Sequence, residues 1–243
     1  MPKFSVLPLL FFPMITWGDC TEHLQAWAAT LHPELTLDSE RAVCKVNPGN
    51  SSQVLAALPF AVNVTEDGDG DYGLDVLVAD AASGKVIAHT YQGAAIESDA
   101  IRFNSLRLDT ARYQLAPGIR AFGVRVSYDG SSRVNPYSSE TLSLYLHDDS
   151  QLRQIMSSLE VSFSGGEWDG MCAGDFNQTE RTLAVGKSVP AGFAGLRITE
   201  KSSARHSAVK GDGCEETQGN SSTETFVLNY DGSRYVVPKG LSF

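Results

Sequence analysis

The chain has 243 residues, of which 42% are hydrophobic and 20% charged, the proportions of an ordinary globular protein, so intrinsic disorder is not expected. The length suffices for one large domain or two small ones, with a sizeable core. A formal net charge of −10 makes the chain a poor binder of nucleic acids and anionic membranes and suits a cationic partner, although solubility alone would also explain it.

The first eighteen residues have the pattern of a secretory signal peptide. Lys3 precedes the apolar run FSVLPLLFFPMITW, and Thr16 and Gly18 fit the small-residue positions of a cleavage site that leaves Asp19 first. The run is too short to span a membrane comfortably. We expect residues 1–18 to be a signal peptide and residues 19–243 to form a single β-rich domain, periplasmic or secreted. A buried N-terminal segment is one alternative, and a lipid anchor at Cys20 is another, which Asp19 fits badly.

Four cysteines, Cys20, Cys44, Cys172 and Cys214, follow the expected cleavage site. An even number in an oxidising compartment predicts disulfides, and three pairings are possible. We favour Cys20–Cys44 with Cys172–Cys214, because each pair closes a local loop; four free, buried thiols are the alternative. No CxxC occurs, so neither a zinc knuckle nor a redox dithiol is indicated.

One short helix is predicted over residues 21–31, with Thr21 as its N-cap and Pro33 as its stop. Its apolar positions have helical spacing and are Leu24, Trp27, Ala28 and Leu31. A further helical turn is expected near residues 150–157.

The rest of the chain alternates between apolar and polar residues, as half-buried strands do. Clear examples are residues 122–128, 142–146, 159–163 and 226–230, separated by turn sequences such as Asp-Gly and Gly-Gly. The pattern predicts a mainly β fold of short antiparallel strands, arranged as a propeller or a sandwich. The polar stretch 201–223 is expected to be a long surface loop.

The segment TEDGDGDYGLD, residues 65–75, lies between two strand-like runs and concentrates negative charge. Glycines separate its aspartates, so the loop can curl around a Ca²⁺ ion, which prefers six to eight oxygen ligands. The candidate ligands are the carboxylates of Asp67, Asp69, Asp71 and Asp75 and the backbone carbonyl of Gly73. A bound ion would cancel the repulsion between the carboxylates. An acidic turn without metal is the alternative.

The loop departs from the EF-hand pattern, because Tyr72 stands where that motif has glycine and Val78 where it has glutamate. The stretch GDGDYGLDVLVADAASGKVIAH instead resembles the calcium-binding β-hairpins of FG-GAP type found in propeller repeats. It reads as a strand over 74–79, a turn over 80–84 and a return strand over 85–89.

Catalytic motifs are missing from the sequence: it contains no HExxH, no GxSxG and no phosphate-binding glycine loop. The histidines have no metal-ligand spacing; they are His23, His32, His89, His147 and His206. Two of the 29 acidic side chains converging in a β cleft would leave no sequence signature. A secreted hydrolase of envelope polymers therefore stays an alternative to a binding protein.

Residues 165–175, GGEWDGMCAGD, offer an anchor for a basic partner. Trp168 stands between Glu167 and Asp169, among flexible glycines and next to Cys172. The alternative is that Trp168 packs over a disulfide. Tyr137, in the sequence RVNPY, is a second loop candidate with the same alternative.

Five stretches together resemble a group of secreted proteins of Gram-negative bacteria; they are CKVNP (44–48), the acidic loop, SSRVNPY (131–137), GEWDG (166–170) and YDGSRY (230–235). The layout is more distantly similar to periplasmic immunity proteins, which are β-rich, bind calcium and inhibit a lysozyme-like effector. The resemblance implies a non-enzymatic inhibitor with a structural calcium ion. Lysozymes are commonly basic, so an acidic inhibitor would associate with them faster. A structural envelope component without such a target is a further alternative.

Overall fold

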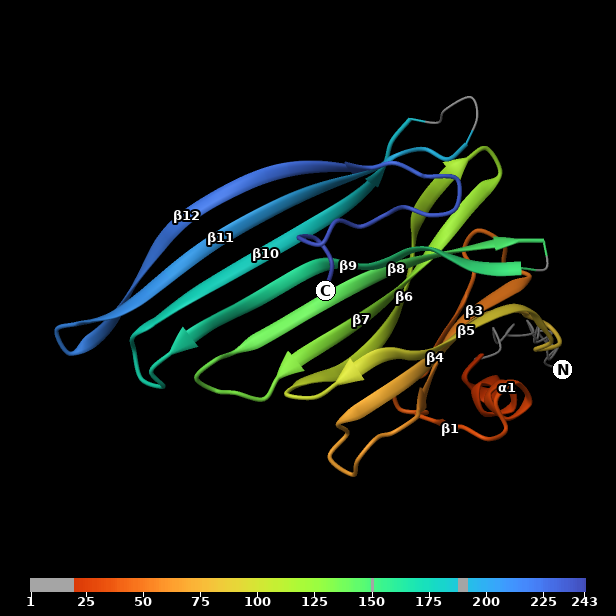
Figure 1. Cartoon of the computed structure of the whole chain (residues 1–243), viewed down its shortest axis with the longest axis horizontal. Helices are drawn as coiled ribbons and strands as arrows, with labels where there is room; N and C mark the ends of the chain where they lie inside the picture. Colours follow the sequence, from red (N-terminus) through yellow and green to blue (C-terminus); the bar gives the residue numbers. More distant parts are fainter. Residues whose placement is uncertain (1–19, 150, 188–191) are drawn as a thin grey trace, which may run out of the picture.

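The computed structural model describes residues 20–149, 151–187 and 192–243, which form two antiparallel β-sheets and one short helix (Figure 1). The predicted mainly β fold is confirmed, and the two packed sheets correspond to the sandwich rather than to propeller blades. The predicted signal peptide, residues 1–18, lies outside the described residues.

The first sheet has five strands in the order β1-β3-β4-β5, and β2 also pairs with β3. Its strands are β1 (Thr36–Leu37), β2 (Val43–Val46), β3 (Gln53–Ala61), β4 (Gly70–Asp80) and β5 (Val86–Ser98). The hairpin predicted over residues 74–89 is present as the β4–β5 pair.

The second sheet is a meander in which each of seven strands pairs with its neighbours in the sequence. Its strands are β6 (Ile101–Ala116), β7 (Ile119–Gly130), β8 (Tyr137–Asp148), β9 (Gln151–Trp168), β10 (Gly174–Val185), β11 (Leu196–Lys210) and β12 (Gly213–Leu228). The predicted alternating segments 122–128, 142–146 and 159–163 lie within β7, β8 and β9.

Three hydrophobic clusters hold these layers together. The first fills the space between the sheets, where Leu74 and Val76 of β4 meet Val124 of β7. The second lies on the other face of the second sheet, where Tyr235 and Leu241 of the C-terminal segment cover it. The third joins the helix to the outer face of the first sheet. Each fully buried large apolar side chain contributes roughly 1.5–3 kcal/mol.

The predicted N-terminal helix is present, but its α-helical part starts later than predicted, so that His23 and not Thr21 is the N-cap. A 3₁₀ turn, η1 (Cys20–His23), leads into α1 (Leu24–Leu31), which buries Leu24, Trp27 and Ala28. The favoured disulfide Cys20–Cys44 ties this segment to β2. No helix within the described ranges is long and apolar enough to cross a membrane.

The helical turn predicted near 150–157 is wrong, because the described residues from Gln151 onward belong to β9. The apolar residues there do have helical spacing. In the structure the β8–β9 register shifts between Leu144, which pairs with Met156, and Tyr145, which pairs with Gln154. The neighbours Ile155 and Met156 therefore both enter the second cluster, while Leu152 lies in the first.

The surface loop predicted over residues 201–223 is also wrong, because these residues form most of the long β11–β12 hairpin. The strands are polar because this part of the sheet is a single layer with solvent on both faces; residues 213–225 are all exposed. Figure 1 shows the hairpin extending beyond the rest of the molecule. The second favoured disulfide, Cys172–Cys214, lies at that end.

Candidate functional site

His32 lies directly after α1, on the outer face of the first sheet. Its backbone N–H donates to the carbonyl of Ala28 (2.9 Å), and Pro33, which cannot extend a helix, follows it. The helix is fixed against the sheet through Trp27, whose Nε1 donates to the carbonyl of Gly84 (2.6 Å). The chain therefore presents the His32 imidazole to β4.

Asp75 lies in the middle of β4 and is 0% exposed. Its neighbours Leu74 and Val76 face the other sheet, whereas Asp75 shares the outer face with Leu77, under the helical segment. An unpaired carboxylate at such a depth would be strongly unfavourable, so it requires partners. The placement of Asp75 on an otherwise apolar face is the first indication of a functional site.

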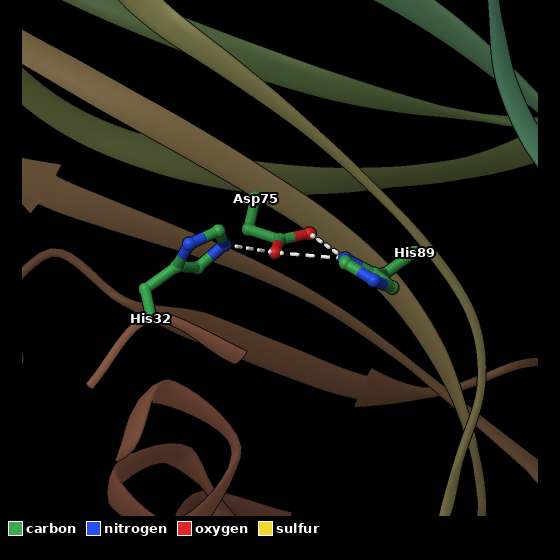
Figure 2. Close-up of side chains that lie close together, drawn as sticks. All are labelled: His32, Asp75 and His89. Carbon is green, nitrogen blue, oxygen red and sulfur yellow. Dashed lines mark hydrogen bonds and ion pairs between the residues drawn. The ribbon is translucent and has the colours of Figure 1, made fainter. Parts of the chain in front are cut away.

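Two histidines supply those partners (Figure 2). The Nε2 atom of His32 lies 2.7 Å from Oδ2 of Asp75. The Nδ1 atom of His89 lies 3.0 Å from the same oxygen and 3.3 Å from Oδ1. His89 comes from β5, where it pairs with Leu77 of β4. The His32 side chain is 11% exposed and that of His89 41%, so the cluster opens to solvent beside His89.

An aromatic wall surrounds His32. Its ring centroid lies 4.2 Å from that of Tyr91 and 4.9 Å from that of Phe60. Burial raises the pKa of the Tyr91 phenol, and the negative charges of Asp75 and Glu34 raise it further. Tyr91 is therefore a neutral, apolar neighbour that limits the rotation of the imidazole.

The three side chains form a chemically distinct group, which we call the His–Asp–His cluster: His32, Asp75 and His89. Their ligand atoms lie within 4.8 Å of one another, and no other group of three potential metal ligands occurs among the described residues. The sequence did not reveal it, because the histidines lie 43 and 14 residues from Asp75 and follow no motif. The detectable signal was a carboxylate within the apolar run LDVLVA.

The residues of the predicted calcium site do not all lie in one loop. Asp67 and Asp69 lie in the turn before β4, whereas Asp71, Gly73 and Asp75 lie within the strand. Four residues of strand separate the Cα atoms of Asp71 and Asp75 by about 13 Å. Two oxygens on one Ca²⁺ ion lie at most about 5 Å apart, which is too short a distance for both carboxylates to reach one ion. The structure thus does not bring Asp75 together with the other aspartates. A calcium site formed by the remaining three stays a prediction.

Asp69 has one feature that fits a cation site. Its Oδ1 atom is buried and has no hydrogen-bond partner in the described structure. The guanidinium Nε of Arg102 lies 3.6 Å away, beyond hydrogen-bond distance. The turn itself is closed by the N–H of Thr65, which donates to the carbonyl of Asp69 (2.9 Å).

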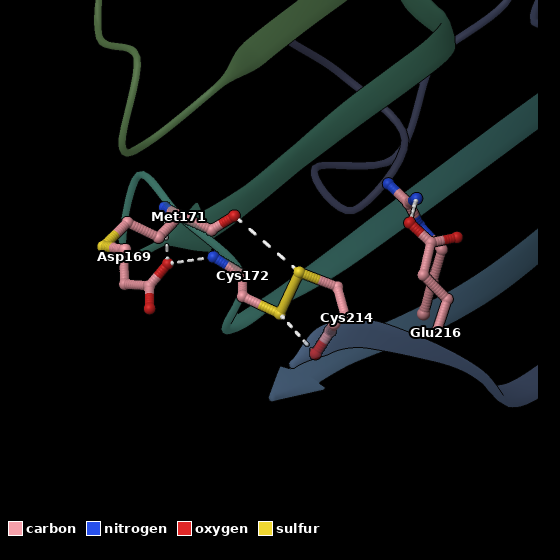
Figure 3. The surroundings of a disulfide bond; sticks show 7 residues. Asp169, Met171, Cys172, Cys214 and Glu216 are labelled. Atoms are coloured by element: carbon pink, nitrogen blue, oxygen red, sulfur yellow. Dashed lines mark hydrogen bonds and ion pairs between the residues drawn. A yellow bond between two sulfur atoms is a disulfide. The ribbon is translucent and has the colours of Figure 1, made fainter. Parts of the chain in front are cut away.

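A second candidate site lies at the tip of the single-layer sheet, which we call the distal end: the turn residues 169–173 and 211–212 and the groove between them. The groove has a volume of about 430 Å³. It is lined by Trp168, Met171, Phe176, Arg133, Arg205 and the Cys172–Cys214 disulfide. Figure 3 shows this disulfide, which joins the β9–β10 turn to the start of β12. Met171 is 84% exposed.

The predicted partner-binding residues lie close together but differ in their surroundings. Trp168 ends β9 and lines the groove beside the disulfide, and Glu167 is exposed. Asp169 shapes the turn: its Oδ1 accepts hydrogen bonds from the N–H groups of Met171 (2.8 Å) and Cys172 (2.7 Å), which lower its pKa. Tyr137 is half-buried and packs edge-to-face on Phe163, so its contacts are those of a packing residue.

A further pocket, of about 810 Å³, lies elsewhere, at one mouth of the space between the sheets. Its floor is apolar, with Leu55 and Phe122, and its rim carries His147, Asp148 and Asp149. It does not include the His–Asp–His cluster.

No family model matches the chain, and neither a curated protein nor a solved structure matches it.

Proposed function

We propose that this chain is a non-enzymatic, extracytoplasmic binding protein whose distal end binds a basic secreted protein. The sequence resemblance implies the class of that partner, a lysozyme-like cell-wall hydrolase that the chain would inhibit. The two disulfides support a periplasmic or secreted location, because such bonds persist in oxidising compartments.

The observation that carries the proposal is an aromatic groove at the distal end of the second sheet, where the sheet is a single layer outside the core clusters. A single layer of polar strands gains little from burial, so its length is not explained by stability. Trp168, Phe176 and Met171 gather there next to the disulfide that joins the β9–β10 turn to the start of β12. Large side chains of this kind, partly exposed at a rigid groove, are typical anchors of protein interfaces.

The charge of the distal end favours a basic partner. Glu216 lines the groove, and the turns and strand ends at this end of the sheet carry five further carboxylates: Glu167, Asp169, Asp175, Asp212 and Glu215. The cationic side chains here are fewer: Arg133 lines the groove, Arg205 pairs with Glu216 (2.5 Å) and Lys210 pairs with Glu215. Arg205 also lies over the Phe176 ring, 4.5 Å from its centroid. The end is therefore net acidic, which accelerates association with a basic protein at low salt.

The test measures both binding to a basic lysozyme and the lysozyme's release of dye-labelled peptidoglycan fragments. We expect inhibition by the wild-type chain, weakened at least about 30-fold by Trp168→Ala, the effect of losing an anchor worth about 2 kcal/mol. Val227→Ala, which trims an exposed apolar side chain near the other end of β12, is the matched control and should inhibit normally. Equal inhibition by both variants, or no binding to basic lysozymes, would contradict the proposal.

The same assay addresses the hydrolase alternative, for which the pocket between the sheets provides room. Release of labelled fragments by the chain alone would favour an enzyme. Loss of that release in Asp148→Asn and Asp149→Asn would place the activity at the rim of the pocket.

A further inference from the structure

We propose that His32, Asp75 and His89 bind a zinc ion. This site is separate from the distal end and does not depend on the function proposed there. It also differs from the predicted calcium site, from which it takes Asp75.

The geometry of the ligand atoms carries the inference. Nε2 of His32 and Nδ1 of His89 both point at the same oxygen, Oδ2 of Asp75, at 2.7 and 3.0 Å (Figure 2). Ligands of a tetrahedral zinc ion lie about 3.4 Å apart, given bond lengths near 2.0–2.2 Å. To coordinate one ion, the two nitrogen–oxygen distances would lengthen by about 0.7 and 0.4 Å, and the two imidazole nitrogens, which lie within 4.8 Å of each other, would approach to about 3.4 Å. Rotations of the side-chain torsions can supply shifts of this size.

The donor set selects the metal. Two imidazoles and one carboxylate are borderline ligands that suit zinc and its first-row neighbours, whereas Ca²⁺ takes oxygen ligands. Three protein ligands leave a fourth position for water, and the exposed side of His89 gives solvent access to it. Zinc would also compensate the negative charge of the buried Asp75, which no Lys or Arg contacts among the residues that the structure describes.

The surroundings hold the ligands in place before a metal arrives. His32 is fixed by the end of α1 and by the rings of Phe60 and Tyr91, and Asp75 is fixed in the centre of the first sheet. His89, whose side chain is 41% exposed, has the most room to adjust. A site whose three ligands are already close together needs little reorganisation to bind an ion, which favours affinity.

The experiment uses the tag-free chain, stripped with a chelator and titrated calorimetrically with zinc chloride. We expect one zinc ion per chain, an increase in Tm, and visible absorption of a tetrahedral complex when Co²⁺ replaces zinc. His89→Gln keeps a polar side chain at an exposed position and should weaken zinc binding at least about 100-fold. His206→Gln removes an exposed histidine of the second sheet and should bind zinc as wild type does.

Two results would overturn the proposal. One is the absence of stoichiometric zinc binding to the wild-type chain. The other is equal binding by His89→Gln and His206→Gln, which would place any zinc elsewhere. Asp75→Asn provides a second variant; if it does not fold, His89→Gln still decides. Excess Ca²⁺ should not displace zinc, and displacement would count against the nitrogen ligands.

Discussion

The phenol of Tyr91 occupies the space that a side chain at Gly73 would fill. A Cβ atom built at position 73 would overlap the phenol oxygen and the adjoining ring carbons. The missing side chain lets Tyr91 lie across β4 and reach the His32 ring, 4.2 Å away. Gly73, predicted as a calcium ligand through its carbonyl, therefore has a different observable role: it makes room for the aromatic wall of the His–Asp–His cluster.

Gly73→Ala should be strongly unfavourable. The added methyl group must displace Tyr91, and overpacking of this kind typically lowers the free energy of unfolding by about 1–3 kcal/mol. Denaturant titration followed by tryptophan fluorescence measures the loss. Gly93→Ala is the matched control, because a Cβ there would lie 3.9 Å from the nearest atom, also of Tyr91. It should change the unfolding free energy by less than about 0.5 kcal/mol. Equal effects of the two substitutions would contradict this packing.

The sequence predicts the fold well wherever one face of a strand is buried. Alternation located β7 and β8, because Val124 and Leu142 belong to core clusters while the residues beside them are polar or small: Gly123, Arg125, Thr141 and Ser143. It failed for the β11–β12 hairpin, where neither face of residues 213–225 is covered and no residue pattern distinguishes a strand from a loop. Near Ile155 the pairing with β8 is irregular, so the apolar residues do not alternate with a period of two and their spacing resembles that of a helix.

The candidate sites show the same limit. Local features were accessible: the loop-closing disulfides and the position of Trp168 beside Cys172 follow from short separations in the sequence. The His–Asp–His cluster depends on the packing of α1 against β4, a tertiary contact that no local pattern encodes. The sequence pattern therefore grouped Asp75 with the other aspartates of the acidic loop rather than with His32 and His89, which lie beside it in the structure.

Asp109 gives the protein a defined response to acid. Burial by itself would raise the pKa of its carboxyl. The N–H of Ala111 (2.9 Å), the Arg125 guanidinium (2.7 Å) and the Tyr113 hydroxyl (2.9 Å) donate hydrogen bonds to it, and together they hold the pKa below its usual value. Its contribution to stability is thus fully present above the unfolded-state pKa, about 3.9, and is lost as the pH falls through the lower folded-state value.

Asp109→Asn should lower the free energy of unfolding at neutral pH by about 1.5–3 kcal/mol, the worth of hydrogen bonds to a charged group. Arg125 keeps its pairing with Glu140 (2.6 Å), so its charge is not left alone. The difference between wild type and variant should shrink as the pH is lowered from about 5 toward 2. Urea titrations at a series of pH values measure it. A gap that stays constant down to the lowest pH would show that the charge of Asp109 does not contribute.

Loss of the Cys172–Cys214 disulfide should loosen the distal end selectively. The bond closes a separation of 42 residues, for which the chain-entropy model gives at most about 4 kcal/mol. Replacing both cysteines with serine should speed amide hydrogen exchange around residues 205–217 and leave the centre of β7 and β8 protected, because the core clusters lie elsewhere. The same replacement at Cys20 and Cys44 should act on α1 instead. Uniform acceleration in both double variants would contradict a local role.

Any stabilisation by calcium should depend on the aspartates of the loop before β4 and not on Asp75. We expect Ca²⁺ at about 100-fold excess over its Kd to add roughly 2.7 kcal/mol to the free energy of unfolding, and Asp69→Ala to abolish the increment. Asp75→Asn should leave it intact, because this carboxylate is held by two histidines about 13 Å from Asp71 along the strand.

Thermal unfolding with calcium, zinc or a chelator separates the two ions, because their expected donors do not overlap. No calcium effect in the wild-type chain would mean that the aspartates form a solvated acidic turn. Loss of the calcium increment in Asp75→Asn would mean that the strand rearranges to gather all four aspartates. In that case zinc and calcium would compete for the Asp75 carboxylate, and the binding of each ion would have to be measured in the absence of the other.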